Sequence, residues 1–288
     1  MTAEVLRYAA FTADGRGGNP AGVVLDAGSL SDSQMRAIAA AIGYSETAFV
    51  LPTGGDPTLR FFSPVAEVAY CGHATLATAV ALAERNGPGL LRMATAAGAV
   101  SVSTRAEGGS LVATLTSPPT TTRPVDSPVL AAALEALRWT SEQLDPRYPV
   151  HVAYAGHQHL VLGVREHDTL ARLDYDETAL RPLMAHEGWT TAHLFWSETA
   201  TTFHCRDPIP PGGVVEDPAT GAAAAAFGGY LRDLNLVPVP SRLTLHQGEE
   251  MGSPSRLLVD LAREVRTVVV TGTATRLALS PYDELDPA

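Results

Sequence analysis

Two alanine-rich helices, one in each half of the chain, constrain the fold most. We expect the first over Gly72 to Arg85 and the second over Ala222 to Leu234, and each has apolar residues on every face. Such a helix must be covered on all sides, because apolar surface left in water costs free energy. The sequence therefore predicts that each half of the chain wraps strands around one central helix.

Each of these helices is entered through a glycine. The first follows Tyr70-Cys71 and begins at Gly72, and the second follows Glu216-Asp217-Pro218-Ala219-Thr220 and begins near Gly221. The first N–H groups of a helix have no partner within the helix, and the helix dipole is positive at that end. Two such termini that face one cleft would form an anion-binding site that requires no lysine.

The basic residues narrow the chemistry further. All 20 of the Lys+Arg residues are arginine, so the chain has no lysine and no Schiff-base or phosphate-loop chemistry that needs one. The net charge of −11 has no cationic cluster to offset it, which argues against a nucleic-acid partner. A small carboxylate substrate remains compatible, because a pocket can be locally positive in an acidic protein.

The cysteines and the apolar runs bear on the compartment. Cys71 and Cys205 are too few for a disulfide framework, which favours a reducing compartment. Charged residues interrupt the first 18 positions, so no signal-peptide core is expected there, and no apolar run reaches the roughly 18 residues of a membrane span. We expect a soluble cytoplasmic protein without a membrane partner.

Shorter elements surround the two helices. In the first half we expect strands at 5–12, 21–25, 47–51, 59–62, 99–104 and 111–115, with a capped helix from Ser31 to Gly43. The last two of these strands flank the turn Glu107-Gly108-Gly109 and are expected to form a hairpin. In the second half we expect helices at 130–137 and 176–186, with strands at 150–154, 160–164, 194–205, 242–246, 257–261, 267–272 and 276–279, then a frayed acidic tail. The Ser-, Thr- and Pro-rich stretch 116–128 is interpreted as a linker. The predicted domains are 1–117, with a strand returning from about 265–288, and 118–264.

Six short runs identify a family resemblance. Together, and in this order, they resemble the PhzF family, the phenazine-biosynthesis-like isomerases of the diaminopimelate epimerase fold, over roughly residues 5 to 280. The runs are Gly18-Asn19-Pro20-Ala21-Gly22-Val23, Ser45-Glu46-Thr47-Ala48-Phe49-Val50, Arg60-Phe61-Phe62-Ser63-Pro64, Cys71-Gly72-His73-Ala74-Thr75-Leu76-Ala77, Glu216-Asp217-Pro218-Ala219-Thr220-Gly221 and Gln247-Gly248-Glu249-Glu250-Met251-Gly252.

The resemblance implies an α+β fold of two pseudo-symmetric domains, each with a mostly antiparallel sheet around a central helix, and an active site in the cleft between them. It implies that Glu46 moves a proton on a small unsaturated carboxylic acid, that His73 and Asp217 assist, and that no metal or organic cofactor is used. It also favours a homodimer. The substrate-binding residues that it indicates are Asn19, Cys71, Gly72, Gly156, Thr220, Gly221 and Ala222.

The residue types suit this chemistry. Moving a double bond requires one group that takes a proton from carbon and returns it elsewhere, and donors for the charge that develops between the two steps. Glu46 can act as the proton shuttle, and the N–H groups of Gly72, His73 and Gly221 can hold the substrate carboxylate. The predicted function is an isomerase that shifts a carbon–carbon double bond in a cyclic or amino-acid-derived acid of secondary metabolism.

Several other interpretations stay open. Glu46 could be an ordinary strand-edge carboxylate, His73 a structural hydrogen-bond donor, and Asp217 only a helix N-cap. Cys71 could serve an epimerase or racemase, since proline racemases share the fold and use one cysteine from each half. A second thiol is missing between Pro218 and Gly221, however, and Cys205 is interpreted as structural. A non-catalytic protein that binds small acids is the last alternative.

Three histidines bear on metal binding, and two departures from the family pattern bear on the identity of the substrate. His151, His157 and His159 suggest a metal site on a strand face, but no acidic or thiol partner has matching spacing, so no metal is expected. Ala222 stands where many members of the family have serine, and Ser253 stands where they have arginine. These departures indicate a related reaction on a different acid.

Overall fold

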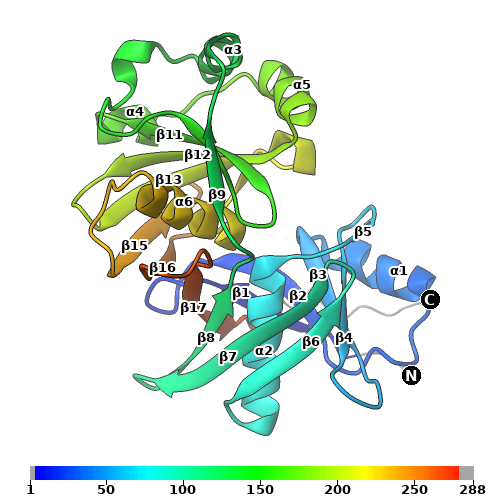
Figure 1. Ribbon diagram of the computed structural model, residues 1–288. Helices are drawn as coiled ribbons and strands as arrows, with labels where there is room; N and C mark the ends of the chain where they lie inside the picture. The colour runs from blue at the N-terminus through cyan, green and yellow to red at the C-terminus, as the bar shows by residue number, and fades with distance from the viewer. Residues whose placement is uncertain (1–3, 279–288) are drawn as a thin grey trace. The chain divides into compact units, whose positions relative to one another are not determined.

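The structure is a computed structural model that describes residues 4–278 of the 288-residue chain (Figure 1). The chain forms two compact units, with borders between Leu115 and Thr116 and between Val270 and Thr271. The sequence placed these borders at 117/118 and near 264/265. The predicted acidic tail and the end of the predicted returning strand lie outside the described residues. No helix within residues 4–278 has the length and hydropathy needed to cross a membrane.

The first unit consists of the N-terminal elements and the last strand. Its elements are β1 (Leu6–Ala10), β2 (Asn19–Val24), α1 (Asp32–Ile42), β3 (Glu46–Leu51), β4 (Thr58–Phe62), β5 (Glu67–Val68), α2 (Gly72–Asn86), β6 (Leu90–Thr95), β7 (Gly98–Glu107), β8 (Ser110–Thr116) and β17 (Val269–Arg276). Helix α1 begins at the capping box that the sequence predicts, with Ser31 and Gln34 satisfying each other's backbone N–H groups, and ends at Gly43 in the left-handed conformation.

The second unit contains the remaining elements. These are β9 (Thr121–Pro124), α3 (Ser127–Leu137), the 3-10 turn η1 (Ser141–Gln143), β10 (His151–Tyr154), β11 (Gln158–Val164), α4 (His167–Ala171), α5 (Glu177–Glu187), β12 (Trp189–Ser197), β13 (Thr202–Pro208), the 3-10 turn η2 (Pro210–Gly212), β14 (Glu216–Asp217), α6 (Gly221–Asp233), β15 (Ser241–Gln247) and β16 (Ser255–Leu261).

The two units repeat one order of strand pairing. In the first, β1–β2 is antiparallel, β2–β3 parallel, β3–β4 antiparallel, β4–β6 parallel and β6–β7 antiparallel. In the second, β10–β11, β11–β12, β12–β13, β13–β15 and β15–β16 follow the same alternation. A two-residue strand, β5 or β14, precedes the central helix in each unit. The pseudo-symmetry expected from the sequence is thus visible in the topology, together with parallel pairs that the sequence did not predict.

Strands surround the central helix of each unit. Helix α2 packs against β1, β2, β3 and β7, and the pairings of the first unit close a circuit through β8 and β17 back to β1. Helix α6 packs against β9, β10, β11, β12 and β16. Every residue from His73 to Ala83 of α2 is buried, and so is every residue from Ala223 to Leu231 of α6. The predicted central helices are confirmed.

Small residues make this close packing possible. A Cβ built on Gly229 of α6 would lie 2.3 Å from Oγ1 of Thr120, and one built on Gly228 would lie 2.8 Å from Cγ1 of Val259. Both distances are shorter than packed atoms tolerate, so any side chain larger than hydrogen would push these neighbouring side chains away. The glycines and alanines of α6 therefore let the strands approach the helix axis.

Three predicted segments were wrong in detail. The stretch 116–128 is not a bare linker, because Thr121–Pro124 forms β9 and pairs with β10. The strand predicted over 194–205 is a hairpin of β12 and β13, since Oγ1 of Thr199 accepts the N–H groups of Thr201 and Thr202 and reverses the chain.

The last two predicted strands are one strand, β17, although Leu279 lies outside the described residues. Gly272 does not end it. Instead, a Cβ at Gly272 would lie 2.3 Å from the Phe11 ring, so glycine lets the strand continue past that ring.

Candidate active site

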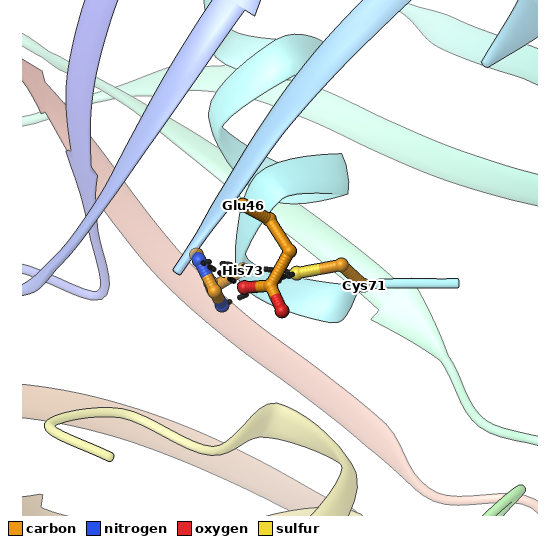
Figure 2. Close-up of side chains that lie close together, drawn as sticks. All are labelled: Glu46, Cys71 and His73. Atoms are coloured by element: carbon orange, nitrogen blue, oxygen red, sulfur yellow. Dashed lines mark hydrogen bonds and ion pairs between the residues drawn. The ribbon is translucent and has the colours of Figure 1, made fainter. Parts of the chain in front are cut away.

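Four of the predicted site residues meet in the first unit, at the starts of their elements. Asn19 begins β2, Glu46 begins β3, Cys71 is the N-cap of α2, and His73 is the second residue of that helix. Because β2 and β3 are parallel and Ala21 is opposite Glu46, the two strands begin at the same edge of the sheet. The N-terminus of α2 reaches this edge as well, which brings the three side chains of Figure 2 together.

Short contacts join these side chains. Oε2 of Glu46 lies 3.5 Å from Nε2 of His73 and 3.5 Å from Sγ of Cys71. Sγ of Cys71 lies 3.3 Å from Nδ1 of His73. Nδ2 of Asn19 lies 3.2 Å from the same Nδ1. A carboxylate, a thiol and an imidazole therefore share one small polar cluster, which Asn19 supports from within the core.

Burial decides the charge of the imidazole. The His73 side chain is 7% exposed, whereas that of Glu46 is 21% exposed. Desolvation lowers the pKa of His73 below its ordinary value, although the Glu46 carboxylate and a hydrogen bond to the Pro20 carbonyl oppose that shift. His73 is therefore neutral at pH 7, with one N–H to donate and one nitrogen to accept.

The N-terminus of α2 offers anion-binding donors beside Glu46. The first bond within the helix runs from the N–H of Thr75 to the carbonyl of Cys71, so the N–H groups of Gly72, His73 and Ala74 have no partner in the helix. A Cβ built on Gly72 would meet nothing within 4 Å. The space beside Gly72 is therefore open.

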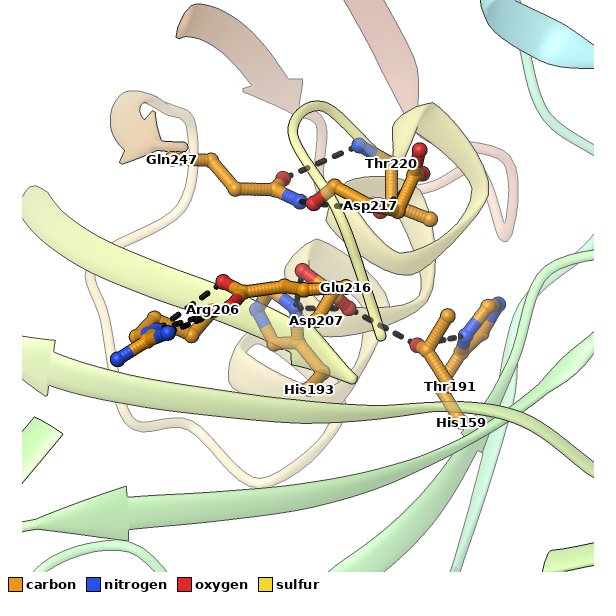
Figure 3. Close-up of polar contacts among 9 residues, drawn as sticks. All are labelled: His159, Thr191, His193, Arg206, Asp207, Glu216, Asp217, Thr220 and Gln247. Atoms are coloured by element: carbon orange, nitrogen blue, oxygen red, sulfur yellow. Dashed lines mark hydrogen bonds and ion pairs between the residues drawn. The ribbon is translucent and has the colours of Figure 1, made fainter. Parts of the chain in front are cut away.

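Two predicted residues of the second unit, Asp217 and Thr220, lie in a cluster of polar side chains in that unit (Figure 3). Oγ1 of Thr220 donates to Oδ2 of Asp217 at 2.6 Å. Nε2 of Gln247 donates to the carbonyl of Asp217 at 2.7 Å, and Oε1 of Gln247 accepts the N–H of Thr220 at 3.1 Å. Thr220, and not Asp217, is the N-cap of α6, so the interpretation of Asp217 as the helix cap is wrong. Gln247 begins one of the six runs that carry the family resemblance, but nothing in its spacing predicts that it holds the turn between Asp217 and Thr220.

Strand β14, which carries Asp217, is held by a buried ion pair. Arg206 of β13 donates to Glu216 from Nε and Nη2, at 3.0 and 2.6 Å, and from Nη1 to two main-chain carbonyls of α4. The side chains of Arg206 and Glu216 are 11% and 4% exposed. Burial raises the pKa of Glu216 above its ordinary value, and the guanidinium opposes that rise. Nothing in the spacing of Arg206 and Glu216 predicts this pair.

A second buried network lies behind the same strand. Asp207 is opposite Asp217 in the β13–β14 pairing and is fully buried. Its carboxylate accepts from Oγ1 of Thr191 at 2.9 Å and contacts Nδ1 of His193 at 3.0 Å, and Thr191 also contacts Nδ1 of His159 at 2.8 Å. Burial lowers the pKa of His159 well below its ordinary value. These groups stabilise the strand pair that carries Asp217.

The remaining predicted binding residues lie at the start of α6 and in the turn between β10 and β11. Gly221 and Ala222 are the first two residues of α6. Gly156 lies in the turn between β10 and β11 with φ of +94°, a conformation that favours glycine. That each of the three contacts a substrate stays a prediction.

Among the residues that the structure describes, the donors that could together hold a metal ion do not include His151, His157 or His159. Nδ1 of His151 contacts Thr122, and Nδ1 of His159 contacts Thr191. Within residues 4–278, imidazole, thiol and carboxylate donors from three residues come within 4.8 Å of one another only at Glu46, Cys71 and His73.

Comparison with known proteins places the chain in a family. Residues 8–279 match the family described as phenazine biosynthesis-like protein. The chain belongs to this family. A phenazine biosynthesis family protein of Bacillus anthracis has the same fold, with a TM-score of 0.86 and 25% identity over 96% of this chain and 98% of that one. The confirmed family resemblance rests on motifs that include Glu46, His73 and Asp217.

Two relatives of this chain carry isomerase names. The uncharacterized isomerase YddE of Escherichia coli K12 is 30% identical, with 96% of this chain and 97% of the relative covered. The trans-2,3-dihydro-3-hydroxyanthranilate isomerase of Pseudomonas fluorescens is 30% identical, with 88% and 90% covered. A probable proline racemase from Agrobacterium radiobacter shares the fold alone, with a TM-score of 0.64 and 14% identity over 98% and 95%.

Proposed function

We propose that this protein is an isomerase that shifts a carbon–carbon double bond in a small unsaturated carboxylic acid by proton transfer. Its phenazine biosynthesis-like relatives are named isomerases, and one is named for a dihydro-hydroxyanthranilate, a cyclic amino acid. The observation that carries the proposal is the position of the Glu46 carboxylate, 3.5 Å from a buried neutral imidazole at the N-terminus of a central helix.

This position puts a base beside an anion site. The N–H groups of Gly72, His73 and Ala74 can bind the carboxylate of the substrate, which places the substrate's carbon skeleton near Glu46. A bound and oriented substrate turns proton abstraction into an intramolecular step. Because Glu46 remains 21% exposed while its neighbours are buried, it is the member of the cluster that a substrate can reach.

The proposed reaction needs no co-reactant, because Glu46 removes one proton and returns one proton. Glu46 takes a proton from a carbon next to the double bond, and the electron pair of the broken C–H bond moves into the conjugated acid as a dienolate. Hydrogen bonds from His73 and from the helix N–H groups stabilise that charge. Protonated Glu46 then returns its proton to a different carbon, which leaves the double bond shifted and the carboxylate of Glu46 restored.

The second unit is proposed to assist. Asp217 is held by Thr220 and Gln247 in one orientation, as a residue that must donate or accept at a fixed point requires. We propose that Asp217 is a hydrogen-bonding or proton-relay partner in the same reaction, and that Gly156, Thr220, Gly221 and Ala222 contribute to substrate binding. Alanine at 222 removes a hydroxyl from the second residue of α6, so the acid is expected to differ from that of relatives with serine there.

An epimerase that uses Cys71 is the main alternative, because Sγ lies 3.5 Å from Glu46 and 3.3 Å from His73. A thiol-pair mechanism would need a cysteine at the matching place of α6, and the N-cap there is Thr220. Cys205 cannot replace it, since it is buried in β13 and burial raises the pKa of its thiol well above the ordinary value.

Deuterium exchange tests the proposal directly. A panel of unsaturated and cyclic amino acids, with trans-2,3-dihydro-3-hydroxyanthranilate included, is incubated with the protein in deuterated buffer and followed by proton NMR. We expect one compound to isomerise and to gain deuterium, and Glu46→Gln to lower kcat by about 1000-fold with little change in KM. Glu107→Gln, at a hairpin turn with a 60% exposed side chain, is the matched control.

The outcomes separate the alternatives. Full activity in Glu46→Gln would show that the base is a different residue. Cys71→Ala should keep the exchange within about tenfold in the proposed mechanism and abolish it in a thiol epimerase. Binding of an acid without any exchange would identify a non-catalytic binding protein.

We also propose that the protein acts in the cytoplasm as a homodimer and uses no cofactor. Light scattering of the purified chain should give twice the 30.2 kDa of one copy. Isomerisation should persist after dialysis against a chelator.

A further inference from the structure

We propose that Glu46, Cys71 and His73 form a zinc-binding site whose occupation blocks the proton shuttle. The three residues supply one carboxylate oxygen, one thiol sulfur and one imidazole nitrogen, and Figure 2 shows the three side chains converging from β3 and from the start of α2. Thiolate with imidazole is a ligand set that favours Zn²⁺ over the hard ions Mg²⁺ and Ca²⁺. The sequence did not predict this site, because its three ligands are not spaced as a metal motif.

The distances between the three donor atoms fit a tetrahedral ion. Zinc bonds of about 2.3 Å to sulfur, 2.05 Å to nitrogen and 2.1 Å to oxygen, at tetrahedral angles, require separations of about 3.6 Å for S···N, 3.6 Å for S···O and 3.4 Å for N···O. The structure has 3.8 Å from Sγ of Cys71 to Nε2 of His73, 3.5 Å from Sγ to Oε2 of Glu46, and 3.5 Å from Nε2 to Oε2. The cluster is therefore preorganised within about 0.2 Å of zinc geometry.

Charge and surroundings also suit the ion. A thiolate and a carboxylate balance the two charges of Zn²⁺, and the thiol proton of Cys71 is released to the buffer when the Zn–S bond forms. Asn19 is 1% exposed and contacts Nδ1 of His73, and its amide can present either the NH₂ group or Oδ1 to that nitrogen. It can therefore orient the imidazole with Nε2 as the metal ligand.

The site has three protein ligands and an accessible side. Glu46 is 21% exposed, so an ion can enter past it and a water molecule can complete the coordination. Zinc bound to Oε2 of Glu46 lowers the basicity of the carboxylate and occupies the space beside it, so that Glu46 no longer takes a proton from carbon. This consequence rests on the proposed function, but zinc binding itself does not.

The test measures metal binding before activity. The metal-free protein is titrated with Zn²⁺ against a chromophoric chelator, and with Co²⁺ as a spectroscopic probe. We expect one tight zinc site per chain and a thiolate-to-cobalt charge-transfer band in the near ultraviolet. Cys71→Ser should lose both the tight site and the band, and Glu46→Gln and His73→Asn should each weaken zinc binding.

A matched control addresses another cluster of imidazoles. The rings of His204 and His246 stack 5.1 Å apart on β13 and β15, with Glu198 and Glu249 contacting His204. The double variant His204→Asn with His246→Asn should keep the tight site and the cobalt band. If that variant loses the site, or if Cys71→Ser binds zinc as tightly as the original protein, the assignment is wrong.

Activity then tests the consequence separately. Where an exchanging acid has been found, one equivalent of zinc should abolish deuterium exchange, and EDTA should restore it. Exchange that rises with zinc and falls with EDTA would overturn the blocking role. A protein that binds zinc as described but exchanges no compound in its metal-free form would refute the proposed function and leave the metal site intact.

Discussion

Replacing Arg206 with methionine is expected to destabilise the protein by an amount that depends strongly on pH. Methionine fills similar volume, so the main change is that Glu216, with a 4% exposed side chain, loses its guanidinium partner. A buried carboxylate without a partner does not stay ionised, because taking a proton costs less than burying the bare charge. The folded variant therefore carries a protonated Glu216 at neutral pH.

The cost of that proton follows from the ordinary pKa of a glutamate, 4.5. At pH 7 the unfolded chain has an ionised Glu216, and protonating it across 2.5 pH units costs about 3.4 kcal/mol at about 1.4 kcal/mol per unit. At pH 5 the same step costs about 0.8 kcal/mol. The carbonyls of Leu170 and Ala171 also lose the Arg206 donor, which adds about 1 kcal/mol at both pH values.

Urea unfolding followed by circular dichroism at pH 7 and pH 5 measures this difference. We expect Arg206→Met to lower the free energy of unfolding by about 4 kcal/mol at pH 7 and about 2 kcal/mol at pH 5, relative to the original protein. Adding Glu216→Leu should recover most of the loss, because a matched apolar pair leaves no charge to bury.

The sign of the pH effect is fixed by the direction of the pKa shift. The pKa of Glu216 in the folded variant lies above its unfolded value, so the loss of stability grows as the pH rises through 4.5 and above. Arg172→Met breaks an exposed pair with Asp168 and should change stability by less than about 0.5 kcal/mol. An equal loss at pH 5 and pH 7 in Arg206→Met would refute the reasoning.

Three further changes test burial, packing and backbone access. His159→Asn should make stability less sensitive to acid. Burial lowers the pKa of His159 below 6.5, so protonation of this group costs the original protein up to about 2 kcal/mol of unfolding free energy between pH 7 and pH 5. Urea unfolding that shows the same dependence on pH in the variant would contradict this prediction. Gly229→Ala should cost about 1–3 kcal/mol of unfolding free energy, since its Cβ would lie 2.3 Å from Thr120, and an unchanged melting temperature would contradict the packing. Gly72→Ala should leave the free energy of unfolding unchanged or raise it by about 0.5–1 kcal/mol, because the new Cβ meets nothing within 4 Å. It should lower kcat/KM at least about tenfold if the substrate approaches the backbone at Gly72. Normal kinetics in this variant would exclude that approach.

The elements that were predicted correctly are those with a strong local sequence pattern. The capped helix after Ser31, the hairpin around Gly108 and the two apolar helices were expected from the sequence and are present. Each depends on residues within a few positions of one another: a capping side chain, a two-residue turn, or a run of alanines. Short-range patterns of this kind can be read without knowing the fold.

The missed features depend on residues far apart in the chain. The stretch 121–124 becomes a strand only because β10 is there to pair with it. The parallel pairs β2–β3 and β11–β12 leave no mark in either strand, since parallel and antiparallel partners favour the same residue types.

For the site, the sequence predicted roles for Glu46, His73, Cys71 and Asp217 but not which of these residues touch. The first three lie in one cluster because the starts of β2, β3 and α2 share one sheet edge. Gln247, Arg206 and Glu216 acquire their positioning roles only through contacts across strands.

The sequence by itself determined the family, the two central helices and the absence of any lysine chemistry, because these follow from motifs, apolar periodicity and composition. The tertiary structure alone decided the neutral state of His73 and the contact of Cys71 with Glu46. Charge state depends on burial, and contact depends on which strand edges and helix ends meet. Neither property belongs to a residue until the chain has folded around it.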